Sequence, residues 1–270
     1  MFRVLGPLEC TMRGRVQKLG GAKKRALLGI LLLNVNQVVP ASRITEAVWP
    51  EGPPRTSRNI MQNMVWSLRR MLGPMLLTQR PGYSLRAGPG VVDLSVFRAY
   101  AAEGVAALAD GQADSAAEHL RAALGLWRGP ALVDLTELGY HWPELVALET
   151  ARLRAYEDYI DAELARDAAK DVIDALEELV AAHPLRERLC GQLMITLYRL
   201  GCPADALAVY RRARSVIVDE LGIEPGTELQ RLEQAILARD ERVLTSPRGS
   251  RPTMGSRTRT SPSSADNRDR

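Results

Sequence analysis

The sequence predicts a mainly α protein with a small β-sheet near its N-terminus, followed by a part made only of helices. Up to residue 92, short turn-rich runs surround three helical patterns, whereas after Asp93 the patterns are helical throughout. The charge changes at the same place, because residues 1–92 hold 14 Lys/Arg and 3 Asp/Glu while residues 93–242 hold 16 and 27. A basic unit joined to an acidic one indicates different partners for the two parts, and the basic unit suits phosphate.

The expected order of elements in residues 1–92 is strands, three helices and a hairpin. Phe2–Val16 is rich in turn residues and is expected to form small strands. Ala22–Asn34 is apolar and predicts a buried helix that starts with basic residues. Ser42 is the expected N-cap of a short second helix, and the prolines and glycine of Pro50–Pro54 then require a loop.

A third helix is expected over Thr56–Leu72, and its two faces differ in chemistry. Its apolar residues share one arc of about 140° on a helical wheel. The opposite arc holds Arg55, Asn59, Gln62, Asn63, Trp66 and Arg70. No Asp or Glu occurs between Gly52 and Ala87, whereas a solvated helix face usually carries Glu and Lys. Amide and arginine side chains suit base edges and phosphates, so this face predicts DNA contact in preference to a plain solvated surface.

A hairpin is expected over Met75–Leu85, with a basic tip at Gln79-Arg80-Pro81-Gly82. Strands, three helices and a hairpin in this order form a winged helix-turn-helix arrangement. There the third helix enters the major groove, and the hairpin reaches the adjacent backbone or minor groove. Residues 1–92 are therefore predicted to be a winged helix-turn-helix domain with a small β-sheet and a wing, which binds double-stranded DNA.

The helical part contains a repeat. Apolar or small residues follow at +5, +9 and +12 from Gly111, Asp167 and Gly201, and the second and third of these turns lie 34 residues apart. That distance is the tetratricopeptide period. Three helix pairs and a capping helix over Thr227–Arg239 would form a short solenoid, so residues 93–242 are predicted to be an all-α, tetratricopeptide-like domain. A plain helical bundle is the alternative.

No catalytic, metal or cofactor site is expected, so the chain is predicted not to be an enzyme. The three cysteines and three histidines have no ligand spacing, and Pro184 places Cys190 and His183 in different structural units. The P-loop, nucleophile-elbow and zinc-protease motifs do not occur. No apolar run reaches the ~20 residues of a membrane span, so a cytoplasmic protein is expected. Residues 243–270, rich in Ser, Thr, Arg and Pro, are expected to be a disordered tail.

Several segments match a known family. The most specific are "LWRGPALVDL" (Leu126–Leu135), "HPLRERL" (His183–Leu189) and "LGIEPGTELQRLEQAIL" (Leu221–Leu237), and "MQNMVWSLRRML" and "KKRALLGILLLN" fit in the basic unit. Over about residues 2–242 the chain resembles the small Streptomyces antibiotic regulatory proteins (SARPs), which join an OmpR-type winged helix to a bacterial transcriptional activator domain. Trp66-Ser67 departs from the Ser-Arg of many members, so one phosphate contact is expected to be missing. The ATPase module of longer relatives is not expected within this chain.

The resemblance implies a transcriptional activator of secondary-metabolite, often antibiotic, biosynthesis. It implies two protomers in tandem on direct repeats near the −35 region, acting at the nucleoid and recruiting RNA polymerase holoenzyme through the sigma factor and other subunits. The residues predicted to contact DNA are Lys23, Lys24, Arg55, Asn59, Gln62, Asn63, Trp66, Arg69, Arg70 and Arg80. The alternatives are a tetratricopeptide scaffold with a basic N-terminal domain, and a repressor with the same DNA-binding mode.

Overall fold

The computed structural model describes residues 1–240, and its N-terminal unit combines two small sheets with three helices. The elements of this unit are β1 (Phe2–Arg3), β2 (Glu9–Met12), β3 (Arg15–Val16), α1 (Ala22–Leu33), β4 (Val38–Pro40), α2 (Ala41–Val48), α3 (Ser57–Leu72), the 3-10 turn η1 (Gly73–Met75), β5 (Leu76–Gln79) and β6 (Gly82–Leu85). The predicted winged helix-turn-helix fold is confirmed. The tail expected over residues 243–270 lies outside the described residues.

Both sheets are antiparallel and three-stranded, with the orders β1-β2-β3 and β4-β6-β5. The wing hairpin of β5 and β6 is therefore extended by β4, a strand that the sequence did not predict because only three residues form it. Gly82 permits the pairing of β4 with β6, since a Cβ atom there would lie 1.9 Å from the carbonyl oxygen of Val39. The close approach of the two backbones thus fixes the base of the wing against the body of the domain.

The expected start of α2 was wrong by two residues, since the N-cap was expected at Ser42. The helix begins at Ala41, its N-cap position is Pro40, and no side chain caps it. Ser42 lies inside the first turn. Because Pro40 also ends β4, which pairs with β6, the sheet sets where the helix begins, and no hydroxyl cap is needed at Ser42.

The helical part confirms the predicted pairs. Its elements are α4 (Asp93–Ala109), α5 (Ala113–Leu124), α6 (Val133–Thr136), α7 (Pro143–Ala165), the 3-10 turn η2 (Ala169–Asp171), α8 (Ile173–Ala182), α9 (Glu187–Arg199), α10 (Pro203–Leu221) and α11 (Thr227–Ala238). The turns of the three pairs contain Gly111, Asp167 and Gly201, with φ of 72°, 60° and 80°. All three residues adopt the left-handed conformation that commonly ends a helix. The short α6 occupies the irregular insertion between the first and second pairs.

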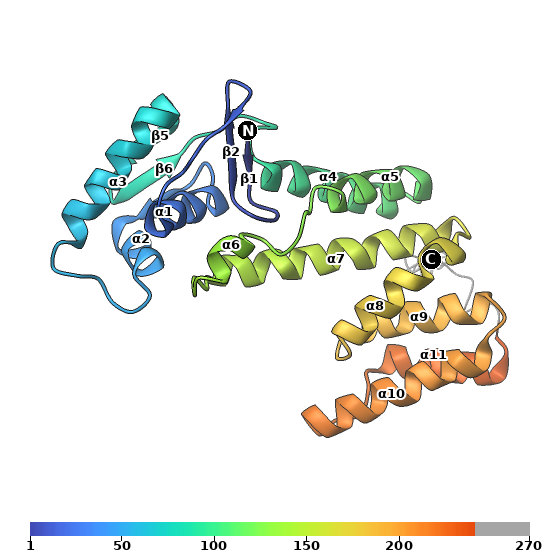
Figure 1. The fold of residues 1–270 in the computed structure, drawn as a ribbon. Coiled ribbons are helices and arrows are strands. Elements are labelled where there is room, and N and C mark those ends of the chain that lie inside the picture. The colour runs from blue at the N-terminus through green and yellow to red at the C-terminus, as the bar shows by residue number, and fades with distance from the viewer. Residues whose placement is uncertain (241–270) are drawn as a thin grey trace, which may run out of the picture.

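Two hydrophobic cores build the molecule, and they do not separate at residue 92. The first core joins β1 and the helices α1 to α3 with α4, α5, α6 and α7 as far as Ala162. The second core begins at Ile160, near the end of α7, and extends to α11. Figure 1 shows α7 between the N-terminal unit at one end of the molecule and α8 to α11 at the other. The N-terminal unit and the first helix pair therefore share one packed core.

Polar contacts reinforce this joint between the two parts. The carboxylate of Asp93 is 2% exposed and accepts hydrogen bonds from the backbone N–H groups of Val4 and Leu5. Trp142 Nε1 donates to the carbonyl oxygen of Ala47 over 3.2 Å. Gly29 of α1 leaves room for the other part, because a Cβ there would lie 3.2 Å from the side chains of Leu132, Leu135 and Trp142. The predicted boundary thus marks a change of element type and charge, with continuous packing across it.

Candidate DNA interface

Helix α3 presents the polar face that the sequence predicts. Its buried residues are Met61, Val65, Leu68 and Leu72. On the opposite side Asn59, Gln62, Asn63, Trp66 and Arg70 are exposed, and Trp66 is 62% exposed although it is a large aromatic side chain. A tryptophan left in solvent by the fold, beside amide groups, suits contact with another molecule.

The wing lies beside this face and is held to α3 by Arg69. The Arg69 Nε donates to the carbonyl oxygen of Leu76 over 3.1 Å, and its guanidinium also bonds to the hydroxyl of Thr78. A groove between helix and wing is lined by Gln62, Asn63, Val65, Trp66, Arg69, Thr78 and Tyr83. Arg69, one of the residues predicted to contact DNA, is thus placed where it positions the wing, while Arg80 is exposed at the wing's tip.

The remaining predicted residues extend the surface on either side of α3. Arg55 is exposed in the loop before the helix. Lys23 lies over the ring of Trp49, 5.7 Å from its centroid, so its exposed ammonium group is held near α2. Lys24 is half-buried, and its Nζ lies 3.4 Å from the Ser67 hydroxyl of α3. The structure therefore brings the start of α1 and the far half of α3 together, which sequence spacing alone does not show.

Trp66 and Arg70 form a stacked pair on the exposed side of α3. The guanidinium carbon of Arg70 lies 5.0 Å from the centroid of the Trp66 ring. Such a cation–π contact contributes ~0.5–1 kcal/mol at an exposed site and orders both side chains. Arg70 thus keeps its hydrogen-bond donors available for an anion while one of its faces rests on the ring.

The charged side chains of the predicted DNA-contacting surface around α3 are all positive. Within residues 1–240, none of the ten predicted DNA-contacting residues forms an ion pair. The basic residues of the N-terminal unit that do pair are Arg3, Arg25 and Arg43, with Glu9, Asp134 and Glu144 respectively. Cations near α3 are therefore not neutralised by the protein itself, and an anionic partner can neutralise them.

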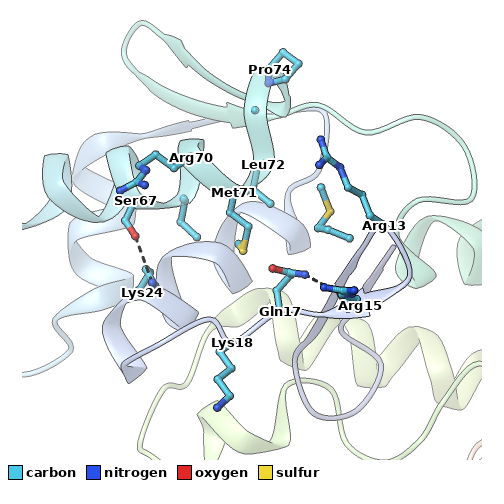
Figure 2. A pocket seen from close by; sticks show the side chains of 13 residues that line it. Arg13, Arg15, Gln17, Lys18, Lys24, Ser67, Arg70, Met71, Leu72 and Pro74 are labelled. Carbon is cyan, nitrogen blue, oxygen red and sulfur yellow. Dashed lines mark hydrogen bonds between the residues drawn. The ribbon is translucent and has the colours of Figure 1, made fainter.

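Sequence reasoning missed a basic cleft next to α3. Figure 2 shows it between the C-terminal end of α3, the start of α1 and the β2–β3 hairpin. It has a volume of about 1030 Å³, and its basic lining residues are Arg13, Arg15, Lys18, Lys24 and Arg70. Three of these were not predicted. The only sequence signal was the density of cations in residues 13–25, since the hairpin and α3 are more than 40 residues apart.

Comparison with known proteins identifies relatives along most of the chain. The family described as bacterial transcriptional activator domain matches residues 92–237. The chain is 37% identical to the transcriptional regulatory protein EmbR of Mycobacterium tuberculosis over 243 residues, covering 87% of this chain and 63% of EmbR. It is 37% identical to the transcriptional regulatory protein MoaR1 of the same organism over 87% of this chain and 78% of MoaR1. The transcriptional regulator RedD of Streptomyces coelicolor is 36% identical over 88% of this chain and 71% of RedD.

The solved structures include a matching protein. The structure of Mycobacterium tuberculosis EmbR in complex with a low-affinity phosphopeptide aligns with a TM-score of 0.83 and 37% identity, over 88% of this chain and 65% of that one. This chain thus spans less than two thirds of EmbR. None of the described helices combines the length and apolar character that crossing a bilayer requires. These relatives are regulators, in agreement with the expectation that the chain is not an enzyme. The chain belongs to the SARP family of transcriptional regulators, with a bacterial transcriptional activator domain over residues 92–237.

Proposed function

We propose that this chain is a sequence-specific DNA-binding transcriptional activator. The observation that carries the proposal is the exposed face of α3, where amides, arginine and tryptophan stand without any acidic residue beside the wing. A scaffold protein does not require such a face. Its position between the wing and the start of α1 is the position from which a winged helix places its third helix in the major groove.

In this proposal the side chains divide into base readers and phosphate binders. Gln62 and Asn63 are exposed on α3 and carry paired donors and acceptors that suit adenine, and Trp66 offers apolar contact. Arg70 on α3 and Arg80 at the tip of the wing are exposed cations that form no ion pair within residues 1–240, which suits them to backbone phosphates. Arg69 acts indirectly, by holding the wing strand in place.

The shared core gives the proposed activator a fixed geometry. Because α4, α6 and α7 pack directly against the N-terminal unit, the helical part is held at one orientation relative to bound DNA. We propose that its acidic surface meets RNA polymerase holoenzyme next to the −35 region, with two protomers in tandem on direct repeats. We further propose that the genes so activated encode secondary-metabolite biosynthesis, in the cytoplasm where the nucleoid lies.

The test is protection mapping of DNA upstream of the chain's own gene, preceded by selection of bound duplexes from a random pool. We expect a selected motif that recurs in direct repeat, and a footprint next to the −35 element that grows when polymerase is added. Purified transcription should rise with the protein present. A lack of any selected motif would favour the scaffold alternative, and a footprint that blocks polymerase would show a repressor.

A further inference from the structure

The basic cleft beside α3 is not accounted for by base reading or by the wing. Figure 2 shows Arg13 and Arg15 of the β2–β3 hairpin on one side, and Lys24 and Arg70 on the other, whereas Lys18 points away from them. Among residues 1–240, no acidic side chain lines the cleft. Four cations from the hairpin, α1 and α3 thus line one cleft, although Arg70 of α3 is more than 40 residues from the other three in the sequence.

The fold leaves these cations without neutralising partners. In residues 1–240, no carboxylate forms an ion pair with Arg13, Arg15, Lys24 or Arg70; Lys24 contacts a hydroxyl and Arg70 an aromatic ring. Nearby, Arg3 is paired with Glu9 on the same sheet. Mutually repelling charges gathered without counter-charge favour an anion in the space between them.

The turn of the hairpin supplies a second, independent observation. Arg13 and Gly14 form the two-residue turn between β2 and β3, and both have positive φ, 50° and 72°. Such a turn favours Asn or Gly at its first position, because the left-handed conformation costs an ordinary side chain about 1 kcal/mol or more. Arginine is therefore a locally unfavourable choice there, and its presence indicates a use for its charge.

The cleft continues the reading face of α3. Gln62, Trp66 and Arg70 are spaced four residues apart, so they form one row along the helix, and Arg70 lines the cleft. At 1.5 Å per residue, Gln62 and Arg70 lie about 12 Å apart along the axis. The major groove is about 12 Å wide, so when Gln62 faces base edges, Arg70 and the cleft lie at the groove's border, where phosphates run.

We infer that the cleft holds backbone phosphates of the DNA strand bordering the groove that α3 reads, and that the β2–β3 hairpin is a second backbone clamp opposite the wing. The inference rests on the proposed function, because it places the duplex along α3. In this arrangement Arg13 and Arg15 reach the strand from the hairpin while Lys24 and Arg70 meet it from the helices. The duplex is then held on both sides of its reading helix.

The test uses the full chain and the double variant Arg13→Asn/Arg15→Gln. Asparagine accepts the left-handed turn, so the variant should keep or raise the thermal midpoint of the wild type. The matched control is Arg211→Gln/Arg212→Gln, which removes two exposed charges from α10, in the second core's half of the molecule. Affinity is measured for a selected duplex and a scrambled one, at about 50 and 200 mM salt. Over this range each phosphate contact lowers the affinity about 3.5-fold as salt rises.

Because the double variant can no longer neutralise two phosphates, the affinity advantage of the wild type over it should shrink about 12-fold between the two salt concentrations, on both duplexes. The control should match the wild type. With the double variant, the stretch of DNA protected from hydroxyl radicals should be shorter than with the wild type, at one edge of the site only. An unchanged salt dependence in a folded variant would overturn the inference while leaving the proposed function standing. The inference would also be overturned if the variant bound DNA normally but no longer bound polyglutamate, because the cleft would then bind an acidic polypeptide and not the DNA backbone. A wild type that binds neither duplex would overturn the proposed function and this inference with it.

Discussion

Asp93 is the residue whose loss should damage the joint between the two parts most. Its carboxylate accepts from Val4 N–H at 2.9 and 3.0 Å, from Leu5 N–H at 3.2 Å and from Leu94 N–H at 2.8 Å. It thereby ties the first turn of α4 to the chain that follows β1. Burial raises the pKa of Asp93, while these N–H donors and Arg128 act in the opposite direction. The change to consider is Asp93→Ala.

The size of the effect follows from the three buried donors. Each of the three N–H groups left without a partner costs about 1–3 kcal/mol, so the substitution should reduce the free energy of unfolding by about 3–9 kcal/mol. Single domains are stable by only about 5–15 kcal/mol, which makes this a large fraction of the whole. Asp93→Asn keeps one acceptor oxygen but turns an amide NH2 toward the donors, so it should cost about half as much.

The assay is chemical denaturation together with hydrogen exchange. Asp110→Ala serves as the control, because Asp110 is exposed and, within residues 1–240, its hydrogen bond runs from its backbone N–H to Ala106; the change should alter stability by less than about 0.5 kcal/mol. Exchange should accelerate at the amides of Val4 and Leu5 and less in α9 and α10, which belong to the second core. A decrease below about 1 kcal/mol with protected Val4 and Leu5 amides would refute this reasoning.

Three further outcomes are expected. Gln62→Ala should weaken binding to the selected duplex by about 1–3 kcal/mol and scarcely affect random DNA, as measured by titration; equal losses would remove Gln62 from base reading. Arg69→Gln should lower the free energy of unfolding by about 1–2 kcal/mol because the wing loses its bonds. Arg70→Gln should lower it by no more than about 0.5–1 kcal/mol, since only the cation–π contact with Trp66 is lost, and should reduce the slope of log affinity against log salt by about one; identical behaviour of the two variants would contradict these assignments. A fragment of residues 1–92 should fail to fold cooperatively, while residues 1–166 should fold and bind DNA, as judged by circular dichroism and titration; a stable shorter fragment would show that the shared core is dispensable.

The helical part could be predicted because its signals are local. Gly111, Asp167 and Gly201 stand at turns, and small or apolar residues at constant offsets from them pack within each pair. Ala116 and Ala206, both at +5, are fully buried. Turn chemistry and packing are properties of residues close in sequence, so the spacing alone carries them.

The joint and the cleft depend on pairs of residues that are distant in sequence. In the sequence Asp93 resembles an ordinary first-turn carboxylate of a helix, yet it binds the backbone of Val4, and Trp142 reaches Ala47. Nothing in the spacing of these residues fixes that pairing. The same limit applies to the proposed DNA site, where the exposed face of α3 was predictable from its periodicity. The attachment of Arg69 to the wing required the fold.

A shared core constrains how the proposed activator could use the proposed tandem sites. If the helical part were joined by a flexible linker, two protomers could meet on repeats of almost any separation. Here the N-terminal unit packs tightly against the helices, at Gly29, Leu132 and Trp142. Each protomer therefore has a fixed orientation relative to the DNA that it binds. Two such bodies present the same surfaces to polymerase only when their sites lie on one face of the duplex, about 10.5 base pairs or a multiple apart. Inserting half a helical turn between repeats should therefore abolish activation while each single site is still bound, because the insertion separates the two protomers without changing the affinity of either for its own site.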